Sequence, residues 1–269
     1  MRWKSGSSKP REDGIWRAIG QGMAINQSPK LDGKRVLVTG GTTGVGRATA
    51  ALLARQGCRV FICGSDPRHL EDAIKEIEAS GGEVGGTASD LGTTEGIHGL
   101  LAAADEWLGG LDIAILNAGL GSHGLLIDME HEECRKVIHV NLVSYVSCAL
   151  EGIKRMKGKG GQIVMTGSMS AELAEENAAV YVATKAGVRG FAYSLRKEAN
   201  PMGIRVSLVE PGSIGTDMVD ESPEQQKKAQ EDLKMLKAED IAESILFILS
   251  QPERCDVITM QVRPRLQII

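Results

Sequence analysis

The stretch TGGTTGVGRATA, residues 39–50, decides the fold of this chain. It follows the apolar run Val36-Leu37-Val38, which is typical of a buried parallel strand. From Val45 onward apolar side chains recur at helical spacing, so a helix is expected directly after the glycines. Four glycines lie at this junction, at positions 40, 41, 44 and 46. A plain strand-to-helix turn needs only one, so the stretch predicts that a ligand approaches the backbone here.

The place of these glycines predicts what the ligand is. The first turn of a helix offers unpaired N–H groups and the positive end of the helix dipole, and both favour a phosphate. The spacing is Thr39-Gly40-x-x-x-Gly44-x-Gly46. It fits neither the G-x-x-x-x-G-K-[ST] loop of nucleoside triphosphatases nor the G-x-G-x-x-G loop. The glycine loop is therefore expected to bind phosphate by a different arrangement.

Strand-like and helical segments alternate along the rest of the chain. The strand-like runs are 35–39, 59–63, a weaker one near 84–88, 112–116, 162–166, 205–209 and 257–262. Helical patterns lie between them, near 45–56, 67–80, 94–108, 131–156, 178–200 and 238–250. This alternation predicts an α/β fold, a single Rossmann-like doubly wound domain with a mostly seven-stranded parallel sheet flanked by helices. Such sheets bind ligands at the carboxyl ends of their strands, where the strand order reverses.

Composition narrows the class of protein. The chain has 269 residues, and the domain is assigned to 31–269. A net charge of −4 gives no reason to expect a nucleic acid or an anionic membrane as partner. No stretch approaches a membrane span, and the amino terminus lacks the apolar core of a secretory signal. Five cysteines without C-x-x-C spacing favour a reduced, cytoplasmic protein without a structural metal.

Residues 1–30 differ from the rest of the chain. They are polar, contain Gly, Ser and Pro, and predict an N-terminal extension that is partly flexible. One apolar patch, made of Ile15, Trp16, Ile19 and Met23, fits a short amphipathic helix. The sequence leaves two alternatives open for this segment, a mobile tail or a helix docked on the domain or on a neighbour.

A second informative stretch is Tyr181-Val-Ala-Thr-Lys185. Residues four apart share one face of a helix, so the phenol and the ammonium are expected side by side. A free tyrosine titrates near ~10, and a nearby positive charge lowers this pKa toward the range useful to a general acid or base. Taken alone, the spacing is better explained by an ordinary helix with a packed Tyr and a solvated Lys.

Four further motifs accompany this pair, in a fixed order along the predicted strands and helices. They are Asn117-Ala118-Gly119, Asn141, Ser168, and Pro211-Gly212 followed by Thr216. Each has a simpler explanation as a turn, a cap or a helix kink, but these explanations do not account for the shared order. With the glycine loop, the motifs resemble the short-chain dehydrogenase/reductase family over residues 31 to about 262.

The resemblance implies a catalytic role for four residues. Tyr181 would donate a proton to a carbonyl oxygen, or accept one from an alcohol, and Ser168 would hydrogen-bond that oxygen as charge develops on it. Lys185 would lower the pKa of Tyr181 and bind the nicotinamide ribose. Asn141 would hold a water that links Lys185 to solvent, and the hydride would come from the cofactor.

The resemblance also implies a cofactor site. Asn117 and Gly119 would support its floor, Asp90 would face the adenine, and Thr216 with the backbone of Ile214 would hold the carboxamide. The full set of expected cofactor contacts is Gly40, Thr42, Thr43, Gly44, Val45, Gly46, Arg47, Gly64, Ser65, Asp90, Leu91, Asn117, Ala118, Gly119, Tyr181, Lys185, Pro211, Gly212, Ile214 and Thr216.

The choice between NAD and NADP depends on the end of the second strand. Gly64 stands where NAD-binding members of the family carry Asp, which binds the ribose 2′-hydroxyl and repels a 2′-phosphate. Ser65 stands where many NADP-binding members carry Arg, and Arg47 could supply positive charge. Asp66 followed by Pro67 fits the N-cap and first residue of the next helix. NADP(H) is therefore favoured, with NAD(H) as the alternative.

The predicted activity is an NAD(P)(H)-dependent oxidoreductase that interconverts a ketone or aldehyde and an alcohol. A 3-oxoacyl thioester (acyl-carrier-protein) reductase is the alternative within enzymes, and a nucleotide-binding regulator without turnover is the rival class. The substrate is expected to be a small molecule chosen by 120–124, 169–177 and 217–236. The last two segments are partly acidic, which opposes docking of an acidic carrier protein.

Two features bear on partners. A basic cluster, made of Lys154, Arg155, Lys157 and Lys159, follows a long helix and could attract a carrier protein, but cations also favour a helix C-terminus. The helices 131–156 and 178–200 carry more apolar residues than one sheet face needs. The family resemblance implies that they pair across a two-fold axis into a homodimer or homotetramer.

Overall fold

The computed structural model of the chain describes residues 31–217, 219 and 221–267. Its sheet has the strand order β3-β2-β1-β4-β5-β6-β7, with every pair parallel. In sequence order the strands β1 to β7 are Arg35–Thr39, Arg59–Gly64, Glu83–Ala88, Ile113–Leu116, Gly161–Thr166, Ile204–Pro211 and Thr259–Val262. The predicted parallel seven-stranded sheet is thus confirmed, while the extension predicted for 1–30 lies outside the described residues.

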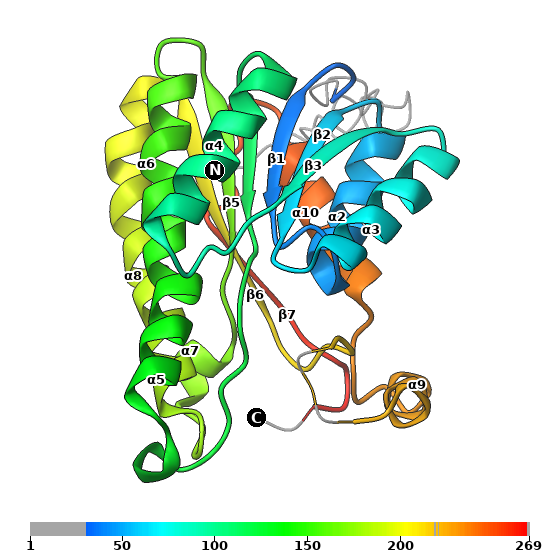
Figure 1. Ribbon diagram of the computed structural model, residues 1–269, viewed down its shortest axis with the longest axis vertical. Coiled ribbons are helices and arrows are strands. Elements are labelled where there is room, and N and C mark those ends of the chain that lie inside the picture. Colours follow the sequence, from blue (N-terminus) through cyan, green and yellow to red (C-terminus); the bar gives the residue numbers. More distant parts are fainter. Residues whose placement is uncertain (1–30, 218, 220, 268–269) are drawn as a thin grey trace, which may run out of the picture.

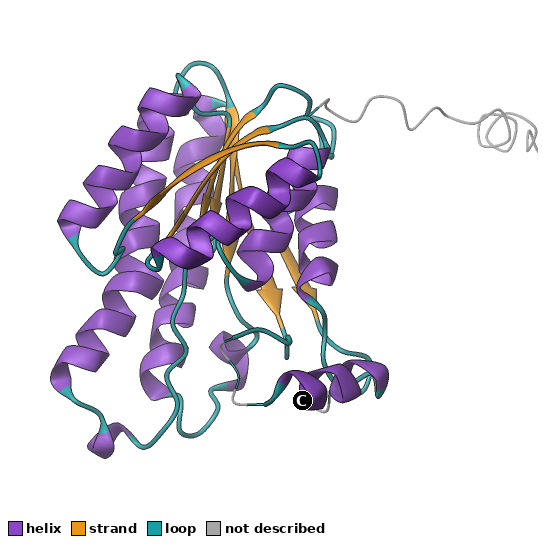
Figure 2. Cartoon of the chain, turned by 45° about the vertical axis from the view of Figure 1, so that its right-hand side comes forward, coloured by secondary structure: helices purple, strands orange, loops and turns teal. Residues whose placement is uncertain are grey.

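The strands are apolar on both faces because both faces are covered by helices. Val36 and Val38 of β1 pack into one core cluster, whereas Leu37 between them packs into the other. Figure 2 shows the strands passing between two layers of helices. The short run after residue 35 is therefore a central buried strand, as its composition predicts.

The helices divide between the two faces (Figure 1). One layer packs on the cluster around Leu37 and contains α4 (Thr94–Leu108), α6 (Ser144–Met156) and α8 (Ala179–Ala199). The other packs on the cluster around Val36 and contains α2 (Gly44–Arg55), α3 (Pro67–Ala79) and α10 (Ala238–Leu249). Within the described ranges, no helix is both long enough and apolar enough to cross a membrane.

The helix predicted over 131–156 is interrupted. It consists of α5 (His131–Ile138), one π-helical turn over His139–Val143, and α6. The spacing of apolar residues does not reveal a π-helical turn, because such a turn adds a residue to the helix without ending it. The short helix α7 (Ser170–Leu173) was not predicted from the sequence. Helix α9 (Pro223–Glu231) begins with a capping box between Ser222 and Gln225.

The strand order reverses between β1 and β4, and this places two polar loop segments together. The register pairs Thr39 of β1 with Leu116 of β4, so the chain leaves both strands at the same level. The Thr39 hydroxyl accepts hydrogen bonds from the N–H groups of Asn117 (2.9 Å) and Ala118 (3.2 Å). The glycine loop and the Asn117 segment therefore meet at the carboxyl edge of the sheet, the expected place for a ligand.

Candidate active site

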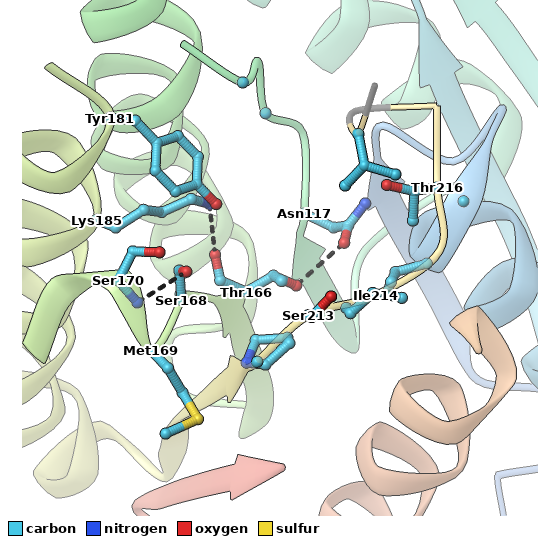
Figure 3. A pocket seen from close by; sticks show the side chains of 18 of the residues that line it. Asn117, Thr166, Ser168, Met169, Ser170, Tyr181, Lys185, Ser213, Ile214 and Thr216 are labelled. Carbon is cyan, nitrogen blue, oxygen red and sulfur yellow. Dashed lines mark hydrogen bonds between the residues drawn. The ribbon is translucent and has the colours of Figure 1, made fainter. Parts of the chain in front are cut away.

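A cavity of about 340 Å³ opens at this edge of the sheet. Its lining comes from the glycine loop, the loops after β4, β5 and β6, helix α8 and Gln267. Figure 3 shows Tyr181 and Lys185 on one side of this cavity, and Ser213, Ile214 and Thr216 on the other, with Asn117 between them. The cavity thus joins chain segments that are far apart in the sequence.

The glycine loop leaves room for a ligand against the backbone. Gly40 has a left-handed φ of +64°, and a Cβ there would lie 2.8 Å from the Cα of Ala118, so this glycine lets the loop pack closely against the segment after β4. Thr43 is the N-cap of α2 but its side chain does not cap the helix, and Gly44 and Val45 of the first turn line the cavity. Backbone N–H groups of the first turn are then available to an anion. These features fit the phosphates of a nucleotide cofactor.

Lys185 lies beneath the cavity and is almost fully buried, with 3% of its surface exposed. Its Nζ donates a hydrogen bond to the Thr166 carbonyl oxygen at 3.0 Å, at the end of β5. It also lies 5.7 Å from the centre of the Tyr181 ring, as the four-residue spacing on α8 predicts. Burial disfavours the ammonium and lowers the pKa of Lys185 to about 8.

Tyr181 differs from the expectation in one respect. Burial raises the pKa of its phenol above the ordinary value, the Ser168 hydroxyl opposes this, and the carboxylate of Glu175 adds to it. The lowered pKa expected from the neighbouring Lys185 is therefore not found, because burial outweighs the other influences. A phenol in this environment is protonated at neutral pH, which is the form of a proton donor.

Ser168 follows β5 and is buried at the cavity wall. Its Oγ accepts a hydrogen bond from the N–H of Ser170 at 3.1 Å, so it also shapes the turn into α7. The N–H of Met169 donates to the Pro211 carbonyl oxygen at 2.9 Å, which ties this turn to the end of β6. The serine is thus held on the same cavity as Tyr181, as the motif order predicts.

Asn141 is fully buried in the π-helical turn and does not line the cavity. Its Oδ1 accepts from the N–H of Leu120 at 2.7 Å, and its Nδ2 donates to the Leu120 carbonyl oxygen at 2.8 Å. A longer contact of 3.4 Å joins Nδ2 to the Thr184 hydroxyl. In this structure Asn141 therefore fixes the loop after β4, which carries Gly119 and Gly121 into the cavity wall.

Asn117 connects the two halves of the cavity. Its Nδ2 donates to the Gly40 carbonyl oxygen at 3.3 Å, and its Oδ1 accepts from the Thr166 hydroxyl at 3.1 Å (Figure 3). The other expected cofactor contacts that line the cavity are Gly44, Val45, Thr43, Ala118, Gly119, Pro211, Gly212, Ile214 and Thr216.

Several expected cofactor contacts lie outside the cavity lining. They are Thr42, Gly46, Arg47, Gly64, Ser65, Asp90 and Leu91. Arg47 is turned onto α3, where its guanidinium pairs with Glu76 and donates to the Asp72 carbonyl oxygen at 3.3 Å. Asp90 forms an exposed turn by accepting from the N–H of Gly92 at 2.9 Å. Neither side chain is directed at a cofactor by the contacts it makes.

The segment after β2 carries one cation that the sequence reading missed. Asp66 caps α3 through the N–H of Arg68 at 2.8 Å, which confirms the interpretation of Asp66 and Pro67 as the start of a helix. The Arg68 guanidinium returns to the same carboxylate at 2.7 Å and is largely exposed, three residues after Ser65. The attached Arg68 lowers the pKa of Asp66.

The substrate side of the cavity was predicted by segment and not by residue. Each of the three expected segments contributes to the lining, through Gly121, His123, Met169, Ser170, Leu173, Glu175, Asp217 and Val219. Gln267 was missed, since nothing near it in sequence indicates a site; its Oε1 accepts from the Ser213 N–H at 3.1 Å. Within the part of the chain that the structure describes, no group of His, Cys, Asp or Glu could hold a metal ion.

Comparison with known proteins agrees with this fold. The family model described as short chain dehydrogenase matches residues 34–227. A Vibrio cholerae protein named 3-oxoacyl-[acyl-carrier-protein] reductase FabG is 35% identical over 202 residues, which cover 74% of this chain and 81% of that protein.

Two of the similar solved structures match over almost their whole length. A short chain dehydrogenase from Burkholderia cenocepacia, in complex with NADP, has a TM-score of 0.79 and 28% identity and covers 87% of this chain and 98% of its own. An alcohol dehydrogenase from Thermococcus sibiricus, complexed with 5-hydroxy-NADP, has a TM-score of 0.81 and 26% identity and covers 88% and 99%.

The fold, the site and these matches define an oxidoreductase of the Rossmann type. The chain belongs to the short-chain dehydrogenase family.

Proposed function

We propose that this chain is an NADP(H)-preferring reductase that converts a small ketone or aldehyde to an alcohol, with Tyr181 as the proton donor. The observation that carries the proposal is the meeting of Ser168, Tyr181 and Lys185 on one cavity with the glycine loop. A non-catalytic nucleotide-binding regulator would have no need of these three side chains beside a substrate-sized space. Bound at the glycine loop, a nicotinamide cofactor would supply the hydride.

The side chains divide the remaining work between them. The protonated Tyr181 phenol donates its proton to the carbonyl oxygen, and the Ser168 hydroxyl hydrogen-bonds that oxygen as negative charge develops. Lys185 keeps its position through Thr166, and its remaining N–H groups would bind the nicotinamide ribose and favour loss of the proton from the phenol. Asn141 keeps the loop after β4 in place and supports proton supply to Lys185, as the family resemblance implies.

The preference for NADP(H) rests on charge at the end of β2. Gly64 offers no carboxylate to a ribose 2′-hydroxyl, and Ser65 offers a hydroxyl to a 2′-phosphate. Arg68 would add a guanidinium once it leaves Asp66. The two similar structures are described with NADP and 5-hydroxy-NADP, which supports the same choice. Arg47 contributes only if it leaves Glu76. NAD(H) stays the alternative cofactor.

A 3-oxoacyl thioester reductase is the second candidate, favoured by the name of the Vibrio cholerae relative. Two observations count against a carrier-bound substrate. The cavity mouth carries Glu175 and Asp217, which oppose an acidic carrier. The basic cluster of residues 154–159 precedes β5, so it lies at the far edge of the sheet, roughly 20 Å from Ser168 for a six-residue strand.

Assembly and location complete the proposal. Exposed apolar side chains line the outer surface of α5 and α6, at Ile138, Val143, Val146 and Leu150, which supports pairing of these helices in a homodimer or homotetramer. A monomer by light scattering at micromolar concentration would contradict it.

All five cysteines are free, which supports a cytoplasmic location. Cell fractionation tests this directly.

The test of function is NADPH oxidation, followed by absorbance, across a panel of ketones and aldehydes. Tyr181→Phe removes the proton donor but little volume, so the rate should fall by roughly 10²–10⁴ while NADPH binding stays close to normal. Full activity in Tyr181→Phe would rule out the mechanism. If the unmodified protein binds NADPH but reduces no carbonyl compound, the non-catalytic regulator is favoured.

A further inference from the structure

Arg189 continues the line of residues that forms the active site on α8. Tyr181, Lys185 and Arg189 are spaced by four residues, so they follow one another along one stripe of the helix. Tyr181 reaches the cavity, Lys185 is bonded to the end of β5, and Arg189 is bonded to the end of β6. The mechanism above uses the first two and leaves Arg189 without a role.

The partner of Arg189 is Glu210, the penultimate residue of β6, whose surface is 0% exposed. The guanidinium binds both carboxylate oxygens, with Nε–Oε1 at 2.6 Å and Nη2–Oε2 at 3.0 Å. A carboxylate buried to this degree requires such a partner, and the two-pronged geometry fixes direction as well as distance. The pair therefore sets the register of α8 against β6.

The same pair touches the segment that carries Ser168. The Glu210 side chain passes next to Gly167, where a Cβ would lie 3.1 Å from its Cγ. On the other side Arg189 Nη2 reaches Glu172 Oε2 of α7 at 3.4 Å. Gln261 of β7 completes the group, since its Nε2 donates to Glu172 at 2.9 Å and to Glu210 at 3.2 Å. One network thus holds both ends of the turn around Ser168.

We propose that Arg189 is a positioning residue of the active site, which holds the segment 168–173 against α8 so that the Ser168 hydroxyl and the Tyr181 phenol meet the same substrate oxygen. The proposal rests on the proposed reductase function. A purely stabilising ion pair would lower the melting temperature when broken but would leave each folded molecule fully active. A positioning pair lowers kcat in molecules that are folded, because small displacements of reacting groups are costly to rate.

The experiment separates position from stability with four variants. Arg189→Met leaves Glu210 buried without its cationic partner, whereas Arg189→Met with Glu210→Met removes both charges and should restore most of the stability. Glu172→Gln weakens the two contacts of this carboxylate, with Arg189 and with Gln261, at a side chain that is 60% exposed, and should fold normally. Arg35→Met is the matched control, because Arg35 forms a partly buried pair with Asp112 at the opposite edge of the sheet.

We expect Arg189→Met to lower kcat by roughly 10- to 100-fold per folded molecule, with the KM for NADPH changed by less than about twofold. The double variant should regain the melting temperature but not kcat, and Glu172→Gln should lose kcat about threefold without a loss of stability. Arg35→Met should lose stability alone. Recovery of kcat in the double variant, or full activity in Glu172→Gln and Arg189→Met, would overturn the proposal.

Hydrogen exchange keeps this test independent of turnover. Faster exchange over 168–173 in Arg189→Met and Glu172→Gln, but not in Arg35→Met, is expected even if no carbonyl substrate is found. In that case the proposed reductase function fails while the positioning of this segment stands. Unchanged exchange in both site variants would refute the positioning role itself.

Discussion

The side chain of Thr42 fills the space in which a side chain at position 64 would lie. A Cβ on Gly64 would meet the Oγ1 of Thr42, with its Cγ2 only 2.6 Å away. Position 64 is therefore a glycine for steric reasons, quite apart from the choice of cofactor. An aspartate at position 64 would therefore displace the Thr42 side chain unless that side chain is shortened as well.

This relationship shapes the first prediction, which concerns cofactor choice. Thr42→Ala with Gly64→Asp should reverse the preference from NADPH to NADH, because a carboxylate near the 2′-phosphate costs about 1–3 kcal/mol, or roughly 10- to 100-fold in affinity. Gly64→Asp alone should weaken both cofactors through the collision. Thr42→Ala is the control and should keep the NADPH preference, measured by fluorescence titration. Tight NADPH binding by the double variant would contradict the charge argument.

The second prediction concerns pH and Lys185. Its pKa is about 8 in the folded chain against 10.5 ordinarily, so between these values the unfolded chain binds more protons and stability rises with pH. Methionine does not titrate, so the Lys185→Met variant lacks this dependence of stability on pH. The variant should therefore gain stability over the unmodified protein below pH 8, and the gain should shrink toward pH 10.5. Melting temperatures measured in parallel across this range test the sign; a constant difference would count against a depressed pKa.

The third prediction concerns Asn141. Asn141→Ala leaves the partly buried N–H and carbonyl groups of Leu120 without this partner, at a cost of up to about 1–3 kcal/mol for each group. Thr184→Val removes the long contact of 3.4 Å together with the hydrogen bond of this hydroxyl to the Tyr181 carbonyl oxygen at 2.7 Å within α8, and it serves as the milder comparison because it leaves both Leu120 contacts intact. Denaturant unfolding should rank Asn141→Ala well below Thr184→Val, with NADPH oxidation falling in the same order. Equal stabilities would mean that the Leu120 contacts are replaced by water.

The fourth prediction concerns how the substrate arrives. A free small ketone should be reduced with higher kcat/KM than a carrier-bound 3-oxoacyl chain, because the cavity mouth carries Glu175 and Asp217. Part of the basic cluster is neutralised, since Arg155 pairs with Asp105 at 2.6 Å and with Glu151 at 2.7 Å, and Lys154 pairs with Glu151 at 2.6 Å.

Lys157→Glu and Lys159→Glu are the better probes of that cluster, because both side chains are exposed and neither breaks these pairs. Both should leave kcat/KM for the carrier-bound chain unchanged at low and moderate salt. A preference for the carrier-bound substrate that weakens with salt and with these reversals would favour the thioester reductase.

Local patterns in the sequence were enough to predict the sheet and the residues at the centre of the candidate site. The run before Thr39 and the alternation after it predict every strand of the sheet, because burial on two faces demands apolar composition. Tyr181 and Lys185 could be paired from spacing alone, since four residues span one helical turn. Ser168 could be placed at a strand end for a similar reason.

What the sequence could not predict depends on contacts between distant segments. Arg189 and Glu210 are 21 residues apart and neither belongs to a recognisable motif. Arg47 was expected at a phosphate, but α3 presents Glu76 to it. The raised pKa of Tyr181 follows from burial, which is a property of the packed chain and not of the residue four positions away.

The π-helical turn over His139–Val143 has a consequence for how this helix can change. One residue more than a regular α-helix needs is inserted there, and the Asn141 side chain faces Leu120 from within that turn. Removing a single residue from the turn would let the flanking helices join as one regular helix with shorter hydrogen-bonded rings. Such a deletion would make the backbone more regular while withdrawing the amide from its partner. A regular α-helix and the contacts of Asn141 with Leu120 therefore exclude each other at this point. Changing the length of the helix tests the site as directly as changing its side chains.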